Sequence, residues 1–394
     1  MKIAFIESLS NKEWNGYTAR YDTGVSGTHC TIFYLAEALV KKNHDITVIQ
    51  TQCNFNPKIV NDVYYQSMEN IPDGDDTYYD VIVFTFNLKD IIILNKIKNY
   101  NKLAFIMNCT ELCKYDKYNH INIFNIFDSN KLNILYVSEN SKLNSFFINY
   151  RIESIRHHLL YNSIDIKDFT NANGELFTYP EDKKENNFVF FACVERGYNI
   201  VLEVAKKFDG KFNIIASNYN NKNYASPSND TPMDNVKIIH PKTTSKQEIL
   251  DWNRKSKYFI YPVVDTSSFR VHYDTFAYVV LEALLCGTIV IAPRMRVFEE
   301  LYGDAIYYID TSDIVDDNHL IWSHWFDPKS CMIWDKVIEN MGFPLVERYV
   351  KAVQHLESDA ELRKTYINRG FSLKEKFLNT KMADRFIDFF ANQL

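Results

Sequence analysis

The chain has 394 residues, of which 46% are hydrophobic and 24% charged, and its formal net charge is −6. This composition favours buried cores over disorder, and the acidic excess argues against general binding to nucleic-acid phosphates. No apolar stretch reaches the roughly 18 residues of a membrane span, and the first ten residues lack the pattern of a signal peptide. We therefore expect a soluble, cytoplasmic protein of two or three domains without a transmembrane segment.

The first half of the sequence alternates between short apolar runs and segments with helical periodicity. We predict strands at residues 2–6, 45–50, 80–85, 103–108, 132–138 and 157–161. Between the first two, the apolar residues of 32–40 fall on one helical face. Such alternation is typical of βαβ units around a parallel sheet, and it predicts a doubly wound α/β domain over residues 1–170.

A second series of the same kind follows a polar segment. Residues 171–187 carry Gly, Pro and a dense mixture of charges, and predict an exposed linker. We then predict strands at residues 188–193, 211–216, 236–240, 258–263, 288–292 and 305–309. The fold class is therefore α/β, with two Rossmann-like domains facing across a cleft. The amphipathic segment 373–394 would form a helix that braces domains 1–170 and 188–372.

The segment 274–287 predicts an enclosed helix with one charge in its interior. Asp274 or Thr275 can cap its start, and Gly287 can close it in a left-handed conformation. Apolar side chains occupy every direction around the helix except at Glu282. A buried carboxylate needs partners, because the desolvation of an unpaired charge is costly.

Two kinds of partner can satisfy Glu282. One is structural: an internal salt bridge or a bond to a neighbouring backbone amide. The other is functional, because a carboxylate commonly accepts from both ribose hydroxyls in nucleotide sites on such folds. Asp274 lies eight positions earlier, at the helix end whose free amides attract phosphate. One helix could therefore span a nucleoside diphosphate and its sugar.

This segment resembles the donor-binding domain of GT-B fold glycosyltransferases, most closely the retaining family 4, with its pattern E-[ST]-F-G-x-x-x-x-E-A-M-A-x-G-T-P-V-I. The resemblance implies that Glu282 binds the ribose, that Asp274 contacts the transferred sugar, and that the backbone of Thr275, Phe276 and Ala277 binds the donor. Asp274 replaces the usual Glu, Ala277 the usual Gly and Ile289 the usual Pro. The matching residues are Thr275, Phe276, Glu282, Ala283, Gly287, Thr288, Val290 and Ile291.

Two further segments resemble phosphate-binding elements of this family. Arg196 and Gly197 follow a predicted strand and fit an S-x-x-R-G-L element, whose Arg grips the diphosphate; a guanidinium fork suits phosphate oxygens. Near the start, Gly24, Ser26 and Gly27 resemble the GG-x-E loop. The glycines permit close backbone approach, and Ser26 can cap the following helix.

Three other features have less specific interpretations. Lys242 and Arg294 are candidates for a second basic residue at the diphosphate, which family members usually have. Residues 161–165 resemble the N-G-[IV]-D element that closes the N-terminal domain, with Asn162 and Asp165 matching, and predict a structural role. Cys109 and Cys113 have no second ligand pair at zinc-like spacing, so we expect no metal.

Together these features predict a glycosyltransferase that moves a sugar from a nucleoside diphosphate donor, such as a UDP or GDP sugar, to the hydroxyl of a glycan, lipid or small molecule. The resemblance implies retention at the anomeric carbon without metal or cofactor, with Asp274 and Arg196 as catalytic residues. The alternative is a homologue that binds sugar nucleotides without catalysis. An NAD enzyme is disfavoured because no G-x-G-x-x-G follows the first strand.

Overall fold

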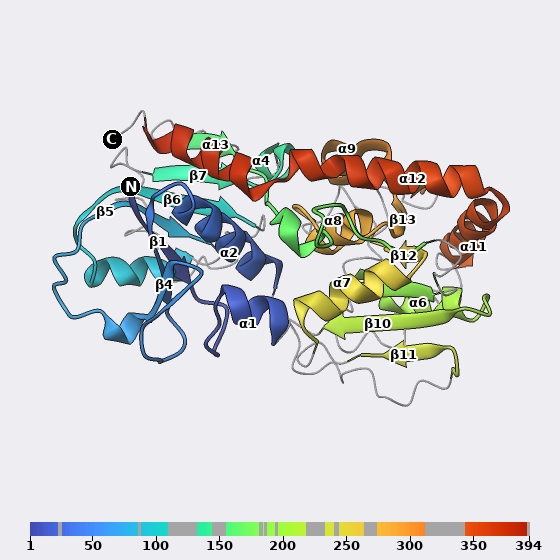
Figure 1. Ribbon diagram of the computed structural model, residues 1–394, viewed down its shortest axis with the longest axis horizontal. Helices are drawn as coiled ribbons and strands as arrows, with labels where there is room; N and C mark the ends of the chain where they lie inside the picture. Colours follow the sequence, from blue (N-terminus) through green and yellow to red (C-terminus); the bar gives the residue numbers. More distant parts are fainter. Residues whose placement is uncertain are drawn as a thin grey trace, which may run out of the picture. The chain divides into compact units, whose positions relative to one another are not determined.

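The computed structural model of the chain divides into two compact units. Unit 1 comprises Met1–Ile166, Asp274–Phe276 and Lys376–Leu394, and unit 2 comprises Lys167–Tyr273 and Ala277–Glu375. Figure 1 shows the elements of each unit and their labels. The structure describes residues 1–22, 26–85, 88–108, 132–143, 155–180, 184, 187–193, 196–217, 233–239, 244–263, 274–311 and 343–391.

Unit 1 is built on an eight-stranded sheet with the order β3-β4-β2-β1-β5-β6-β7-β8. All neighbouring strands are parallel except β3 and β4, which form an antiparallel pair at one edge. The strands are β1 (Lys2–Glu7), β2 (Asp45–Gln50), β3 (Lys58–Val60), β4 (Val63–Ser67), β5 (Tyr79–Phe84), β6 (Tyr100–Met107), β7 (Leu132–Tyr136) and β8 (Arg156–Leu159).

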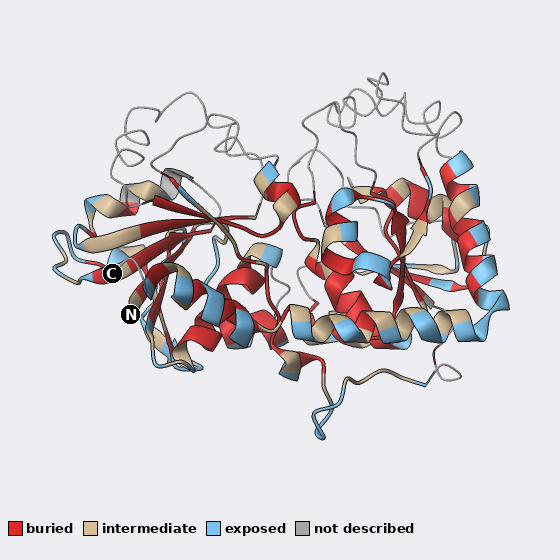
Figure 2. Ribbon diagram, turned by 90° about the horizontal axis from the view of Figure 1, so that it is seen from above, coloured by how far each residue is buried: buried red, intermediate tan, exposed pale blue. Residues whose placement is uncertain are grey.

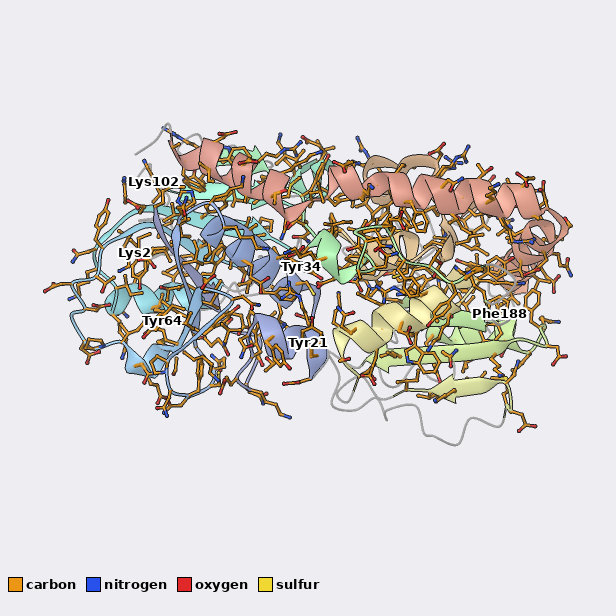
Figure 3. All side chains as sticks on the ribbon, in the orientation of Figure 1. Lys2, Tyr21, Tyr34, Tyr64, Lys102 and Phe188 are labelled. Carbon is orange, nitrogen blue, oxygen red and sulfur yellow. The ribbon has the colours of Figure 1, made fainter. Side chains whose placement is uncertain are left out.

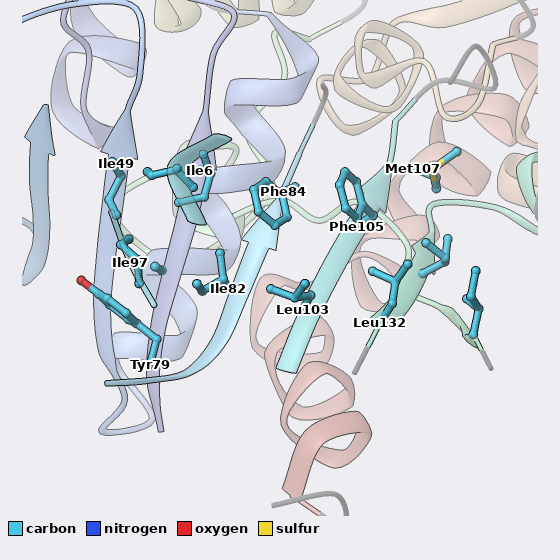
Figure 4. Packing of buried hydrophobic residues seen from close by; sticks show 14 of the residues in the cluster. Ile6, Ile49, Tyr79, Ile82, Phe84, Ile97, Leu103, Phe105, Met107 and Leu132 are labelled. Carbon is cyan, nitrogen blue, oxygen red and sulfur yellow. The ribbon is translucent and has the colours of Figure 1, made fainter. Parts of the chain in front are cut away.

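The core of unit 1 lies on the faces of this sheet. Alternate residues of neighbouring strands point to the same face, and on one face they include Ile82, Phe84 and Phe105 (Figure 4). The rings of Phe84 and Phe105 stack with centroids 4.9 Å apart. The α-helices described in unit 1 are α1 (Gly16–Tyr21), α2 (Gly27–Val40), α4 (Glu139–Leu143) and α13 (Asn379–Ala391).

Unit 2 has a six-stranded parallel sheet with the order β11-β10-β9-β12-β13-β14. Its strands are β9 (Asn187–Cys193), β10 (Lys211–Ser217), β11 (Val236–Ile238), β12 (Tyr258–Ile260), β13 (Ile289–Pro293) and β14 (Tyr307–Ile309). Its α-helices in the described ranges are α6 (Tyr198–Ala205), α7 (Lys246–Lys255), α8 (Tyr278–Leu285), α9 (Arg296–Tyr302), α11 (Phe343–Ser358) and α12 (Ala360–Ser372).

Short 3-10 segments complete the described secondary structure. They are Met68–Asn70, Leu88–Asn95, Ile166–Asp168, Gly303–Ala305 and Leu373–Lys376. In both units the strands are largely buried, whereas many of the helices bury one side and expose the other (Figure 2).

The prediction of two α/β series is confirmed, and each of the twelve predicted apolar runs contains or overlaps a strand. The sequence interpretation missed β3 and β4, which are short, partly exposed and rich in polar residues. Continuous apolar runs reveal strands that helices cover on both faces, but an edge hairpin has no such run.

The strand order reverses once in each sheet. In unit 1 the chain moves from β1 outward to β2 and β4 and then returns to the other side of β1 with β5. In unit 2 it moves from β9 to β10 and β11 and returns with β12. Ligands of open α/β sheets bind outside the carboxyl ends of the strands at such switch points. A site is therefore expected beyond the carboxyl ends of β1 and β5 in unit 1 and of β9 and β12 in unit 2.

The ends of the predicted domains differ from those of the units. Unit 1 ends its first segment at Ile166 rather than at residue 170, and the predicted linker 171–187 lies within unit 2. Within that linker the side chain of Lys184 is buried, and its amine donates to the carbonyls of Ser256 and Gly287. The predicted helix 373–394 is shorter: α13 begins at Asn379, packs against α2 and belongs to unit 1. Its bracing role stays a prediction.

Candidate functional site

The switch point of unit 2 carries Arg196 and Gly197. They follow β9, which ends at Cys193, and Gly197 is the residue before α6, with φ +93°. A Cβ on Gly197 would lie 2.4 Å from the Cγ of Pro262, which follows β12. Both the backbone angle and the space therefore require glycine here. The half-buried Arg196 is thus held at the carboxyl end of β9, at the reversal of strand order.

Glu282 lies in the middle of α8 and is only 2% exposed. Its partner is Lys246, the first residue of α7, whose buried amine forms an ion pair with Oε1 of Glu282. Burial raises the pKa of Glu282 above its usual value, and the Lys246 charge and hydrogen bond oppose this shift. Of the two kinds of partner that the sequence suggests for Glu282, the structural one is therefore present, as a salt bridge with Lys246.

Lys246 was missed in the sequence because it looks like a solvated residue in the first turn of an amphipathic helix. The sequence pattern at the start of this helix could have indicated that Lys246 has a fixed position. Ser245 caps α7 and Glu248 reciprocates, which forms a capping box. This capping box fixes the first turn of α7, and Lys246 lies in that turn. Because a carboxylate has about four acceptor sites, one amine leaves capacity for further donors. The ribose contact of Glu282 stays a prediction.

The start of α8 differs from the prediction. Neither Asp274 nor Thr275 caps this helix; the N-cap residue is Ala277, in a left-handed conformation with φ 55°. Because Ala277 turns the backbone sharply, the residues before it leave the helical path. The Tyr302 hydroxyl donates to the Ala277 carbonyl at 3.1 Å and holds this turn. At the other end Gly287 has φ +73°, so the predicted left-handed termination is confirmed.

The segment Asp274–Phe276 belongs to unit 1. The Thr275 hydroxyl donates to the Asn108 carbonyl at 2.6 Å, in place of the predicted helix cap. The Phe276 ring packs edge-on against Phe377, with centroids 5.4 Å apart. Asp274 is 6% exposed. The structure therefore assigns Asp274, Thr275 and Phe276 to one unit and Ala277 and the rest of the motif to the other.

Asn108 is part of a polar network at the carboxyl ends of the unit 1 strands. Its Oδ1 accepts from the amide of Asn162 at 3.2 Å, and the Thr31 hydroxyl donates to Asn162 Oδ1 at 2.9 Å. Asp165 pairs with Lys41 at 3.3 Å. The residues matched to the N-G-[IV]-D element, Asn162 and Asp165, thus make structural contacts.

The switch point of unit 1 contains a chain of polar contacts that begins at Ser26. Ser26 is the N-cap residue of α2, as predicted, and its backbone amide donates to Nδ1 of His29 at 3.2 Å. The Ser26 hydroxyl lies 2.7 Å from the same nitrogen. On the other side of the ring, Nε2 lies 3.3 Å from Oε1 of Glu7, the last residue of β1. The Trp14 indole and the Ser10 amide donate to Glu7, each at 3.0 Å.

The Glu7 carboxylate is fully buried. Burial alone would raise its pKa, but the His29 ring, the Trp14 indole and the Ser10 amide lower the pKa below its usual value. Glu7 therefore stays ionised and fixes the His29 ring that holds Ser26. The sequence interpretation missed this pair. One signal was available, because Glu7 is a charge at the end of an apolar strand.

The remaining predicted residues lie partly within and partly outside the described ranges. Gly27 is the first residue of α2 and is exposed, and Arg294 is exposed and pairs with Glu299 at 2.6 Å. Gly24, Lys242, Cys109 and Cys113 lie outside the described residues. Cys30 and Cys286 are both buried.

The described residues contain neither a metal-binding cluster nor a membrane-spanning helix. Within those ranges, no three His, Cys, Asp or Glu side chains gather as a metal-binding group. No helix in the same part of the chain combines the length and apolar character needed to cross a membrane.

Comparison with known proteins gives matches among solved structures only. No protein-family model and no curated protein matches the sequence. HepE of Anabaena, crystallised with UDP and glucose, superposes with a TM-score of 0.59 at 11% identity and covers 100% of both chains. The chain has the GT-B fold.

Other GT-B structures agree over nearly the whole length. The glycosyltransferase WaaG, involved in lipopolysaccharide biosynthesis, matches with a TM-score of 0.57 at 10% identity and covers 98% of this chain and 99% of its own. The apo structure of OtsA has a TM-score of 0.59 at 7% identity, with 99% and 98% covered. At such identities the likeness concerns the GT-B fold, and the chemistry must be argued from the residues of this chain.

Proposed function

We propose that this GT-B chain is a glycosyltransferase that moves a sugar from a nucleoside diphosphate sugar to an acceptor hydroxyl. The observation that carries the proposal is the placement of Arg196 and Gly197 at the switch point of unit 2, in the same unit as the buried Glu282. A cation for phosphate and a carboxylate for ribose are the two groups that a nucleoside diphosphate requires. HepE, which has the same fold, was crystallised with UDP.

Departure of the diphosphate is the main chemical task, because negative charge accumulates on its oxygens while positive charge develops on the sugar ring. Arg196 can bind two phosphate oxygens with its planar fork. Backbone amides in the first turn of α8 can supply further donors without a metal. Gly197 permits the close backbone approach that this binding mode needs.

The ribose would donate to Glu282. The carboxylate is paired with Lys246, whose charge and hydrogen bond oppose the rise in its pKa that burial causes. Lys246 in this view orients Glu282 before the nucleotide arrives. The ribose hydroxyls would then complete the hydrogen bonds that one amine leaves open.

Retention of the anomeric configuration is part of the proposal. The bond between the anomeric carbon and the phosphate oxygen breaks, and the acceptor oxygen bonds to that carbon on the same face. The departing phosphate oxygen takes the acceptor proton, so no protein base is needed. Asp274 would orient the donor sugar or support its developing positive charge.

The first experiment separates an enzyme from a protein that only binds the donor. Thermal-shift screening with UDP and GDP identifies the base, and a panel of sugar donors is then assayed for release of the nucleoside diphosphate. We expect release with at least one donor. Binding of a sugar nucleotide without release from any donor would instead support the inactive alternative, which the replacements Asp274 and Ala277 suggest. The anomeric configuration of the product, read by NMR, tests retention.

A matched pair of variants tests the phosphate role. Arg196→Ala should lose at least tenfold in affinity for UDP, with a smaller loss for uridine, because the lost contacts are charged hydrogen bonds to phosphate. Arg369→Ala is the control, since Arg369 lies on α12 and pairs with Asp304 at 3.2 Å. Equal losses for UDP and uridine in Arg196→Ala would contradict a phosphate contact.

A further inference from the structure

Two exposed tyrosines stand next to each other on α1. Tyr17 is 55% and Tyr21 52% exposed, and both are among the most exposed large hydrophobic residues of the described chain. One turn separates them, so they share a helix face. Their ring centroids are 5.0 Å apart with an angle of 49° between the planes. Figure 3 labels Tyr21 at the end of this helix.

The helix that carries them is anchored far more firmly than its six residues would suggest. Asn15 caps its start by accepting from the amides of Tyr17 and Thr18. The Gly16 amide donates to the buried Tyr65 hydroxyl at 3.1 Å. A helix this short is not stable by itself, so these contacts hold α1 in place.

The other face of α1 is fixed by a buried ion pair. Arg20 donates two hydrogen bonds of 2.8 Å each to Glu37 of α2, and a third of 2.9 Å to the Gly16 carbonyl. The guanidinium also stacks over the Phe33 ring at 4.7 Å. The two tyrosines are therefore held on a well-anchored helix. Binding of a ligand to them would cost little entropy from ordering the backbone of α1.

The position of α1 relates it to the switch point of unit 1. It lies in the connection between β1 and α2, and so outside the carboxyl end of β1. Trp14, just before α1, donates to Glu7 at the end of β1. The chain reaches Ser26, the N-cap of α2, five residues after Tyr21. The aromatic pair thus lies on the same connection as the Ser26–His29–Glu7 contacts.

We propose that Tyr17 and Tyr21 form a platform that binds an uncharged sugar ring of the acceptor. The apolar C–H face of a pyranose can pack on the tyrosine rings, and the phenol hydroxyls can exchange hydrogen bonds with sugar hydroxyls. Tyrosine also loses little side-chain entropy on binding, because it has only two rotatable angles. The inference rests on the proposed function and adds to it that the acceptor is a carbohydrate.

The charges near the platform favour a neutral ligand over an anionic lipid surface. Arg20 is buried and neutralised by Glu37. The exposed charged residues of segment 11–22 are Lys12, Glu13 and Asp22, and Glu13 pairs with Lys58, so these four charges sum to zero. A surface that attracts anionic membranes carries clustered Lys and Arg instead.

The test compares variants of the platform with a matched tyrosine elsewhere in unit 1. The double variant Tyr17→Ala/Tyr21→Ala removes both rings, and Tyr17→Phe/Tyr21→Phe keeps the stacking surface. Tyr78→Ala is the control, because Tyr78 is 51% exposed and precedes β5 at the amino end of that strand. Near-UV circular dichroism verifies that each variant is folded.

Two measurements are made on each variant. A glycan array detects binding of neutral oligosaccharides directly, and the enzyme assay gives the ratio of sugar transfer to donor hydrolysis. We expect the double Ala variant to lose at least tenfold in both, through a higher KM for the acceptor. The double Phe variant and Tyr78→Ala should stay within threefold of the wild type.

Three outcomes would overturn the platform. They are array binding by the double Ala variant equal to the wild type, no array binding by the wild type, and binding of wild-type protein to phosphatidylserine vesicles that the double Ala variant alone loses. Array binding that depends on Tyr17 and Tyr21, together with no donor hydrolysis, would refute the enzyme and leave the platform standing. Donor hydrolysis by the wild type, together with array binding that the double Ala variant retains, would support the enzyme and refute the platform.

Discussion

Each unit contains a deeply buried glutamate, and the two are satisfied in opposite ways. Glu7 of unit 1 accepts from the Trp14 indole and backbone amides and lies beside the His29 ring, and its pKa is lowered. Glu282 of unit 2 has one cationic partner, Lys246, and its pKa is raised by burial. Burial is similar, so the donors around each carboxylate decide the direction of the shift.

This difference separates a structural carboxylate from one suited to a ligand. Glu7 has its acceptor sites occupied by groups of the protein, so it can fix the connection between β1 and α2. Glu282 is paired with the Lys246 amine, which opposes the rise in pKa that burial causes, and further donors would lower its free energy. Three predictions test this comparison, and a fourth tests the turn that precedes α8.

The largest effect is expected for Lys246→Met, which keeps the length of the side chain and removes the charge. The Glu282 carboxylate would then be buried without its cation, and we expect a loss of about 3–5 kcal/mol in the free energy of unfolding at pH 7. Urea titration measures this loss. It should be smaller at pH 5, because protonation of Glu282 relieves the unpaired charge. A loss that is the same at both pH values would show that the amine is not the main partner.

The second effect concerns Glu7→Gln. Because charged hydrogen bonds to the Trp14 indole and backbone amides are weakened, we expect about 1.5–3 kcal/mol less stability at pH 7. Since the pKa of Glu7 is lowered in the folded state, its contribution is present above the usual value of about 4.5 and is lost as the pH falls through the folded pKa.

The pH dependence gives this variant its own control. Wild-type stability should fall more steeply on acidification below about pH 4.5 than that of Glu7→Gln. Parallel curves for the two proteins would mean that Glu7 is not held ionised by its neighbours.

The third effect is on nucleotide binding. Glu282→Gln should weaken UDP binding by about 1–3 kcal/mol, because the ribose hydroxyls lose a charged acceptor. Calorimetric titration measures this change. The double variant Lys246→Met/Glu282→Gln separates binding from folding: it should regain stability relative to Lys246→Met, since no buried charge remains, without regaining UDP affinity. Unchanged UDP affinity in Glu282→Gln would remove the ribose role.

The smallest effect is expected at Ala277. A left-handed conformation costs an L-residue roughly 1–2 kcal/mol relative to glycine, and glycine loses part of this gain through chain entropy. Ala277→Gly should therefore stabilise the protein by about 1 kcal/mol in urea titration. Asn43→Gly is the comparison, because Asn43 has φ 63° but is a residue type that tolerates this region. An equal gain at both positions would argue against strain at Ala277.

The site could be predicted from the sequence only where local pattern dictates it. Gly197 follows from its place after a strand, and Gly287 from its place after a helix. The start of α8 could not be predicted, because Asp274 and Thr275 are good capping residues in isolation. The Thr275 hydroxyl bonds to Asn108 instead, a residue far away in the sequence.

The sequence by itself determined the two α/β series and their strands, because strands covered on both faces need continuous apolar runs that are visible locally. The tertiary structure alone decided which polar groups meet. Lys246 reaches Glu282 from 36 positions away, and His29 reaches Glu7 from another element. Such partners depend on how helices and strands pack, and a polar residue carries no local mark of the neighbour that will satisfy it.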